Sequence, residues 1–213
     1  WYAGRNRTLV SARPYSAVTL RDGVKLALVD VVYTDEPSER YQVVVQWDSQ
    51  PLAEYGQLAT IGEVDEHTAY DALYQVDSAR LLLSLIDSSA VIGDVRFTRE
   101  PGAVLPTDAG ARVTESEQSN TSVVFEERAI LKLFRRVHPV PIPDVEITEI
   151  LGERGFPHVV PQLAELRTDR ADLAVVRQYL LGSTDAWNLA HTSLRDLLGT
   201  RMPPEEAGGD FGP

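Results

Sequence analysis

Alternating apolar and polar positions near the start of the chain predict a small sheet. Val24–Tyr33 and Arg40–Trp47 are rich in Val and Tyr, and the polar stretch 34–39 between them predicts a hairpin with a longer loop. Leu9–Val10 and Ala17–Leu20 are weaker strand candidates. The first part of the chain therefore reads as antiparallel sheet.

A helical period follows the sheet. Apolar residues three or four positions apart predict a helix from about Ala69 to Ile86, with Thr68 as its N-cap. One face of this helix would pack on the sheet, and Val91–Phe97 is expected to return as a strand.

The second half repeats the alternation, with one helix inserted after its third strand. Its expected strands are 112–114, Ser122–Phe125, Arg128–Val137, Val159–Leu166 and Leu173–Leu181. Its expected helices are Val145–Leu151, capped by Asp144, and a final one from Ser183 or Thr184 to Leu198.

Turn-forming residues separate the two halves. Arg99–Gly102 and Pro106–Gly110 are rich in Pro and Gly, so we expect a first domain over residues 1–105 and a second over 106–213. Mostly antiparallel strands with interspersed helices predict the α+β class.

Composition and charge narrow the possible functions. The chain has 213 residues and a net charge of −12, which argues against binding to nucleic acid or an anionic membrane. It has no cysteine, which excludes disulfides, zinc ribbons and thiol nucleophiles and fits a cytoplasmic protein. No apolar run approaches the roughly 20 residues of a membrane span. Met202 is the only methionine, so we expect a piece of a longer protein.

Lys132 is the residue that points most clearly to chemistry. It is one of only two lysines, and it lies in the middle of a predicted strand, where alternation places it between Ile130 and Phe134 on one face. Such a cation requires an anionic partner, or else it snorkels to water from an edge strand. Arg128, Arg135 and Arg136 form a local basic cluster with it, which is either a solvated strand end or an attraction for an anionic nucleotide.

Two neighbouring segments favour an anionic partner. The loop Glu117–Ser122 is dense in hydroxyl and amide groups that can bind phosphate oxygens. Pro143–Glu146 begins the inserted helix and offers carboxylates that could pair with Lys132. A polar loop, a strand lysine and a helix carboxylate are typical of the phosphate-binding half of a kinase, although the glycine-rich motif of protein kinases is missing.

These segments resemble the bacterial maltokinases, which are kinases similar to the aminoglycoside phosphotransferases. The resemblance rests on Glu117–Phe125, Ala129–Arg136, Pro143-Asp144-x-Glu146 and the opening Trp1–Arg5. It implies an N-terminal cap domain followed by a kinase-like N-lobe. It also implies transfer of the γ-phosphoryl group of ATP to the anomeric hydroxyl of maltose, giving maltose 1-phosphate for α-glucan (glycogen) synthesis from trehalose.

The resemblance also assigns residues to the nucleotide site. The phosphate-covering loop is Glu117, Gln118, Ser119, Asn120, Thr121 and Ser122; the phosphate-binding lysine is Lys132, and its helix partner is Glu146. The segment between the lobes that borders the adenine is Gln178, Tyr179 and Leu180. Glu126-Glu127 departs from the expected Gly-Asp type of turn. Mg²⁺ ligands and catalytic groups are expected in a C-lobe outside this chain, so we expect the isolated chain to be inactive.

Two alternatives stay open. The same scaffold could phosphorylate another sugar, such as glucosamine. Alternatively, the chain could be a non-catalytic module that docks trehalose synthase, the partner that the resemblance implies, or that forms a homodimer. The sequence settles neither the sugar nor the oligomeric state. The four histidines show no i, i+4 spacing, so we expect no metal site within the chain.

Overall fold

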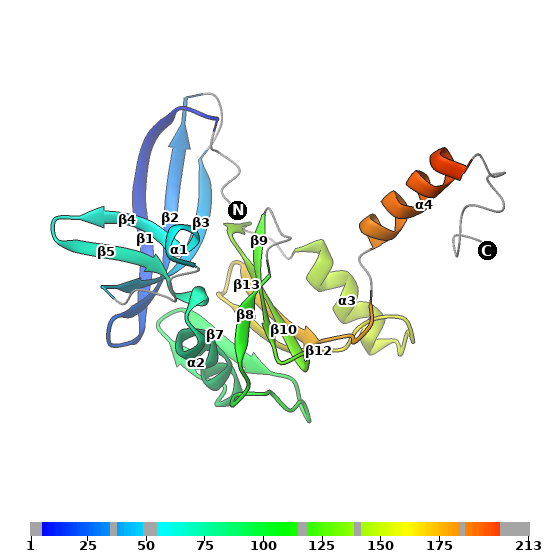
Figure 1. Cartoon of the computed structure of the whole chain (residues 1–213). Coiled ribbons are helices and arrows are strands. Elements are labelled where there is room, and N and C mark those ends of the chain that lie inside the picture. The colour runs from blue at the N-terminus through cyan, green and yellow to red at the C-terminus, as the bar shows by residue number, and fades with distance from the viewer. Residues whose placement is uncertain are drawn as a thin grey trace. The chain divides into compact units, whose positions relative to one another are not determined.

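The computed structural model describes residues 6–34, 38–48, 55–114, 119–138, 142–183 and 186–200 (Figure 1). The chain divides into two compact units, Trp1–Tyr179 and Leu180–Pro213. Within the described residues, antiparallel strands form two sheets in the first unit. The α+β class predicted from the sequence is confirmed.

The first sheet, which we call the cap sheet, contains the predicted hairpin. Its strands lie in the order β1-β2-β3-β5-β4, with β2 at Val24–Tyr33 and β3 at Glu39–Trp47. The two weak strand candidates are parts of one long edge strand, β1 (Leu9–Arg21), whose pairing with β2 shifts register between Pro14 and Ser16. A register shift at a proline lets an edge strand bend without losing its remaining ladder.

The start predicted for the first helix is wrong. Residues His67–Asp71 form β5, which lies between β3 and β4 (Thr60–Val64), and a single 3-10 turn at Ala72–Tyr74 follows. The helix α2 begins only at Val76 and ends at Asp87. The sequence analysis missed β4 and the short helix α1 (Gly56–Ala59). Pairing with β3 and β4 outweighs the local helical spacing, because it gives each of the residues 67–71 a partner strand, and Ala69 and Tyr70 a partner on both sides.

The second sheet, which we call the kinase-like sheet, has the order β6-β7-β12-β13-β10-β9-β8. The predicted strand 91–97 is a hairpin of two strands. The bounds are β6 Val91–Ile92, β7 Val95–Arg99, β8 Ala111–Val113, β9 Asn120–Phe125, β10 Ala129–Phe134, β12 Gln162–Arg167 and β13 Asp172–Gln178. Lys132 therefore lies on a strand with neighbours on both sides, and the edge-strand alternative is wrong.

One predicted strand is broken in two. Instead of a continuous strand 128–137, β10 ends at Phe134, and β11 (Arg136–Val137) leaves the kinase-like sheet to pair with β3 of the cap sheet. Arg135, at the break, is fully buried. Its guanidinium forms an ion pair with Asp71 of β5 and donates from Nε to Thr121 Oγ1 of β9 at 2.8 Å. The chain thus changes sheets around a buried cation.

Helices cover parts of the kinase-like sheet. Ala79, Leu82, Leu83 and Ile86 of α2 are buried in the main core with one face of β10. On the opposite face, α3 (Pro143–Glu153) packs through Val145 against Phe134 and Val175.

In the second unit, α4 (Ala186–Thr200) exposes Trp187, Leu189, Leu194 and Leu198.

The division of the chain at residue 105 stays a prediction. Strands from both sides of that residue share the kinase-like sheet, because β7 pairs with β12. Within the described part of the chain, no helix has the length and apolar character needed to cross a membrane.

The buried ion pair of Arg135 gives the first test. Asp71→Ala is expected to lower the free energy of unfolding by about 3–5 kcal/mol, because it leaves a buried guanidinium without its carboxylate. The control is Asp169→Ala, which breaks the exposed pair with Arg96 and should cost no more than about 1 kcal/mol. Urea unfolding followed by circular dichroism measures both. Equal losses for the two variants would contradict the buried pair's structural role.

Candidate functional site

The candidate site is centred on Lys132 in the middle of β10. Its cross-strand neighbours are Ser122 on β9 and Val175 on β13. The Lys132 side chain is 29% exposed, and its Nζ lies 3.4 Å from Asp144 Oδ2. The lysine is therefore a partly buried cation with a carboxylate partner and remaining access to solvent.

Asp144 lies in the first turn of α3 and joins two cations of the sheet. Its Oδ1 accepts a hydrogen bond from Arg177 Nη1 at 3.2 Å. Arg177 Nη2 also donates to the Asp144 carbonyl at 2.9 Å and to Thr148 Oγ1 at 3.1 Å. A carboxylate in the first turn of a helix is further favoured by the helix dipole. Arg177 and Asp144 together hold the start of α3 on the sheet beside Lys132.

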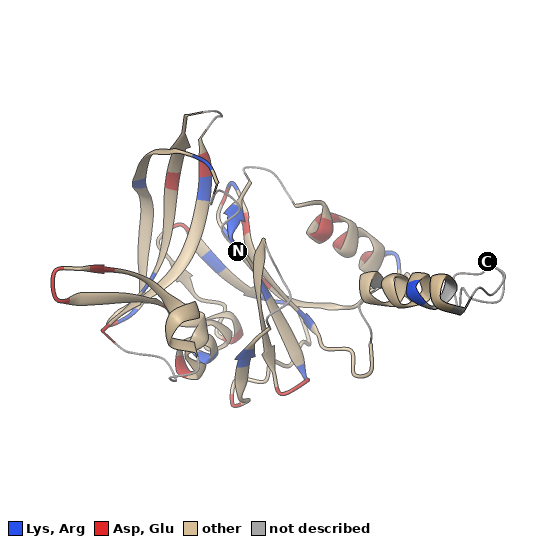
Figure 2. Cartoon of the chain, turned by 45° about the horizontal axis from the view of Figure 1, so that its top comes forward, with Lys and Arg blue, Asp and Glu red and all other residues tan. Residues whose placement is uncertain are grey.

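The charge state of Asp144 follows from this arrangement. Burial raises the pKa of its carboxyl, but the charges of Arg177 and Lys132 outweigh burial, and the net pKa lies below the ordinary value. Asp144 is therefore ionised at neutral pH and neutralises part of the positive charge around Lys132. Figure 2 shows acidic positions along α3, of which Asp144 is the one paired with Lys132.

The structure does not pair Lys132 with Glu146, the partner that the resemblance implies. Glu146 lies two positions further along α3, which is about 200° around the helix axis from Asp144. Its side chain is exposed and lines a cavity of about 460 Å³ with Asp169 and Arg170. The general expectation of a carboxylate from Pro143–Glu146 is confirmed, with Asp144 as the residue that supplies it.

The polar loop before β9 is described only in part. Glu117 and Gln118 lie outside the described residues. Asn120 and Ser122 lie two residues apart on the same face of β9. Their cross-strand neighbours on β10 are Phe134 and Lys132, respectively. Ser122 is buried, and its Oγ has no hydrogen-bond partner among the described residues. Because a buried hydroxyl without a partner is costly, this oxygen is a natural contact for a ligand group placed beside Lys132.

Two other predicted residues of the loop are placed differently. Ser119 lies just before β9, directly after the residues outside the described range. Thr121 is buried with its hydroxyl bonded to Arg135, so the structure does not bring that hydroxyl together with Lys132. The predicted grouping of Arg135 with Lys132 in one basic cluster is wrong, because Arg135 is buried against Asp71.

The predicted inter-lobe segment lies at the end of β13. Gln178 is the last residue of that strand and is exposed. Tyr179 is half-buried, and its backbone N–H donates to the Arg128 carbonyl at 3.2 Å. Leu180 begins the second compact unit. The strand predicted to run to Leu181 thus ends at Gln178, which places the three residues where the two units join along the chain.

Sequence reasoning missed Asp144 as the specific partner and Arg177 as its second cation. A signal for Asp144 was present, because Pro143 is favoured at the first position of a helix and places Asp144 in the first turn. Arg177 offered the signal of strand alternation, since it shares a face of β13 with Val175. The register pairs Lys132 with Val175 on β13, and Arg177 lies two residues beyond Val175. Lys132 and Arg177 therefore both reach Asp144 at the start of α3, which the sequence alone does not show.

The fold and this site define a kinase-like architecture, and solved structures with this fold are known. Glucosamine kinase in complex with glucosamine, ADP and inorganic phosphate matches with a TM-score of 0.58 at 19% identity, covering 92% of this chain and 42% of that one. Crystal form B of glucosamine kinase matches with a TM-score of 0.57, also at 19% identity, covering 97% and 44%. The chain therefore spans less than half the length of these proteins.

A more specific match identifies the first part of the chain. Residues 1–74 match the family model of the maltokinase N-terminal cap domain. The predicted resemblance to maltokinases is thereby confirmed for the cap. The kinase-like fold predicted for the residues after it is supported by the structural matches.

The depressed pKa of Asp144 predicts an acid-dependent contribution to stability. A carboxyl with a lower pKa in the folded than in the unfolded state stabilises the fold above its unfolded pKa and loses that contribution as pH falls through its folded pKa. The stability gap between the wild type and Asp144→Asn should therefore be full near pH 6 and close below about pH 4, the ordinary range for aspartate. Chemical denaturation across this range measures the gap. A gap of constant size would show that the Asp144 charge contributes nothing.

Proposed function

We propose that this chain is the cap and nucleotide-binding part of an ATP-dependent sugar kinase of the maltokinase type. The proposed reaction transfers the γ-phosphoryl group of ATP to the anomeric hydroxyl of maltose and yields maltose 1-phosphate for α-glucan synthesis. The match of residues 1–74 to the maltokinase cap carries this proposal. The partly exposed Lys132 beside the start of α3 supports it independently, because this arrangement suits a phosphate-binding lysine.

ATP suits the residues around Lys132. Lys132 would bind phosphate oxygens, and Ser122 Oγ, a buried oxygen with no partner among the described residues, would donate a hydrogen bond beside it. Asn120 and Ser119 would extend the polar surface along β9. Glu117 and Gln118 complete the proposed phosphate loop, and Gln178, Tyr179 and Leu180 would border the adenine. Glu146 lines a different cavity, so its pairing with Lys132 stays a proposal that only the sequence resemblance supports.

The described residues are not our candidates for magnesium binding or for catalysis. Among them, no group of three or more His, Asp or Glu side chains is arranged to hold a metal ion. Lys132 and Asp144 can bind and orient phosphate, but phosphoryl transfer also needs metal ions and a residue that orients the acceptor hydroxyl. We propose that these groups belong to a part of the protein beyond the described residues.

A second sugar remains a candidate because of the solved structures. The matching protein crystallised with glucosamine, ADP and inorganic phosphate is a glucosamine kinase. Glucosamine is therefore the alternative acceptor that we propose to test. Docking to trehalose synthase through the cap, and homodimer formation, are further proposals that arise from the sequence resemblance alone.

The substrate assay decides between the two sugars. ADP release by the complete protein, measured in a coupled assay with Mg²⁺ and ATP, is expected to depend on maltose and to be weak with glucosamine. Phosphorus NMR of the product should show a phosphate on the anomeric carbon. Faster turnover with glucosamine would show that glucosamine, not maltose, is the preferred acceptor. Turnover with neither sugar would overturn the proposed activity.

Lys132 gives a direct test of the nucleotide site. Lys132→Met keeps most of the side chain's bulk but removes the charge, so ATP turnover by the complete protein should fall by about 10²-fold or more. Lys25→Met is the matched control, because Lys25 is the other lysine and lies exposed on β2 of the cap sheet. It should retain normal turnover. Near-normal turnover of Lys132→Met would mean that Lys132 serves only as the ion-pair partner of Asp144 and does not act on the nucleotide.

A further inference from the structure

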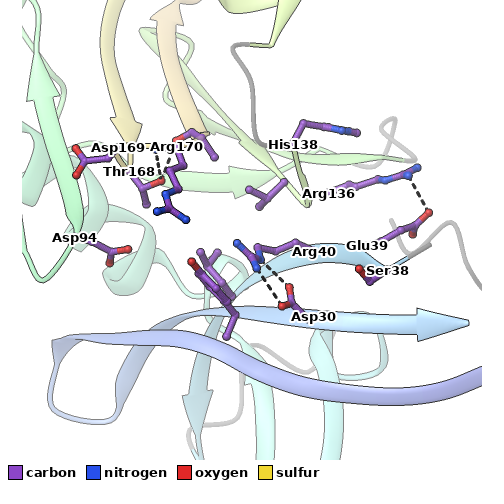
Figure 3. A pocket seen from close by; sticks show the side chains of 14 residues that line it. Asp30, Ser38, Glu39, Arg40, Asp94, Arg136, His138, Thr168, Asp169 and Arg170 are labelled. Atoms are coloured by element: carbon purple, nitrogen blue, oxygen red, sulfur yellow. Dashed lines mark hydrogen bonds and ion pairs between the residues drawn. The ribbon is translucent and has the colours of Figure 1, made fainter.

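A cavity of about 550 Å³ lies apart from Lys132, between the cap sheet and the turn that joins β12 to β13 (Figure 3). Tyr15, Asp30 and Arg40 line it from the cap sheet, and Thr168, Asp169 and Arg170 line it from that turn. Its volume falls within the usual range for small-molecule sites and is far larger than a bare phosphate ion needs.

The cap wall of this cavity is held rigidly. Arg40 donates from Nε and Nη2 to both carboxylate oxygens of Asp30, at 2.7 and 3.0 Å. The Arg40 guanidinium also stacks on the ring of Tyr15, 3.2 Å from the ring centroid. These contacts fix the side chain and leave the two donors of Nη1 free of the Asp30 contact. A fixed guanidinium whose Nη1 lies outside its carboxylate pair can contact an anion in the cavity.

Glu39 organises the neighbouring part of the wall. It is buried and accepts hydrogen bonds or ion pairs from Arg136 at 2.8 Å, Arg7 at 3.0 Å and Tyr41 Oη at 2.6 Å. Burial raises the pKa of Glu39, but the hydrogen bond from Tyr41 and the charges of Arg136 and Arg7 outweigh burial and leave the pKa below its ordinary value. Two guanidinium groups share this one carboxylate, so the local charge is positive.

Arg170 supplies a further positive charge from the opposite wall. Its exposed guanidinium forms no ion pair with any of the described residues, and Figure 3 shows it extending into the cavity toward Arg40. The lining as a whole is mixed in charge, with three guanidinium groups and four carboxylates, and Arg170 is the lining cation that has no ion pair with a described residue. The guanidinium groups are those of Arg40, Arg136 and Arg170, and the carboxylates are those of Asp30, Glu39, Asp94 and Asp169, of which Glu39 and Asp169 also pair with Arg7 and Arg96 outside the lining.

We propose that this cavity binds a phosphorylated sugar, with its phosphate between Arg170 and Arg40. Guanidinium groups are well suited to phosphate, and here they approach from opposite walls. Asp94, Ser38 and Thr168 also line the space and can accept or exchange hydrogen bonds with sugar hydroxyls. A hydroxylated ligand with one phosphate uses both kinds of group.

The same contacts disfavour a nucleotide in this cavity. The Tyr15 ring is already stacked on Arg40 and offers no free face to a base on that side. The lining carboxylates repel a triphosphate more strongly than a phosphate monoester, which carries less negative charge, and Asp94 can accept hydrogen bonds from sugar hydroxyls. The cavity therefore differs in ligand class from the nucleotide site proposed around Lys132.

Calorimetric titration with glucose 1-phosphate, without ATP or an acceptor sugar, tests this proposal. We expect glucose 1-phosphate to bind. Arg170→Gln should raise its dissociation constant at least about tenfold, because this change removes one of the two guanidinium groups proposed to contact the phosphate. Arg170 is exposed, so its replacement should leave the fold intact. Arg154→Gln removes another exposed arginine, one outside the cavity, and should leave affinity unchanged.

Two further titrations distinguish this cavity from the nucleotide site and from a site for phosphate alone. Lys132→Met should bind glucose 1-phosphate normally, and loss of binding in that variant would assign the ligand to the nucleotide site and overturn the proposal. Inorganic phosphate should bind much more weakly than glucose 1-phosphate, because it leaves the hydroxyl-binding groups unused. Equal affinity for the two probes, no binding of glucose 1-phosphate, or an Arg170→Gln variant that binds normally would also overturn it. None of these outcomes depends on the kinase assay.

Discussion

The buried ion pair between Arg135 and Asp71 is the interaction on which the arrangement of the two sheets depends. A guanidinium removed from water must keep its carboxylate, so Arg135 of the kinase-like sheet and Asp71 of the cap sheet cannot separate without a large free-energy cost. Gln42 of β3 strengthens the same junction, because its side-chain amide donates to the carbonyls of Phe134 and Leu173. Polar bonds thus specify how one sheet meets the other, while apolar burial supplies the bulk of the core.

This junction also reaches the proposed nucleotide site. Arg135 bonds to Thr121, whose neighbour Ser122 lies opposite Lys132, so a residue fixed by the cap also fixes the strand beside the lysine. The other side of the site is held by α3, whose N-cap residue, Ile142, donates its backbone N–H to Asp172 Oδ2 at 3.1 Å. The cap sheet and the start of α3 therefore position the two groups that flank Lys132.

Much of this could be predicted from the sequence where local patterns decide the structure. Alternation placed Lys132 correctly among Ile130 and Phe134, and the β2–β3 hairpin followed from its Val- and Tyr-rich runs. The errors arise where residues distant in the sequence determine the local structure. The spacing of residues 67–71 is typical of a helix, but these residues pair with β3 and β4. The pattern of residues 128–137 is typical of one continuous strand, but Arg135 forms an ion pair with Asp71 at the point where β10 ends. The choice of Asp144 over Glu146 depends on the angle at which α3 meets the sheet, which no local pattern contains.

The pairing of β11 with β3 has a consequence for how such proteins can recombine. The cap sheet is completed by residues 136–137, which follow the kinase-like strands β9 and β10 in the chain. Suppose that the N-terminal cap segment of one such protein replaced that of another. Strand β3 would then come from one protein and β11 from the other, and Asp71 and Arg135 would also come from different proteins. In this chain the structural cap thus extends beyond the 74 residues that the family model matches, because it includes β11 and the partner of Asp71.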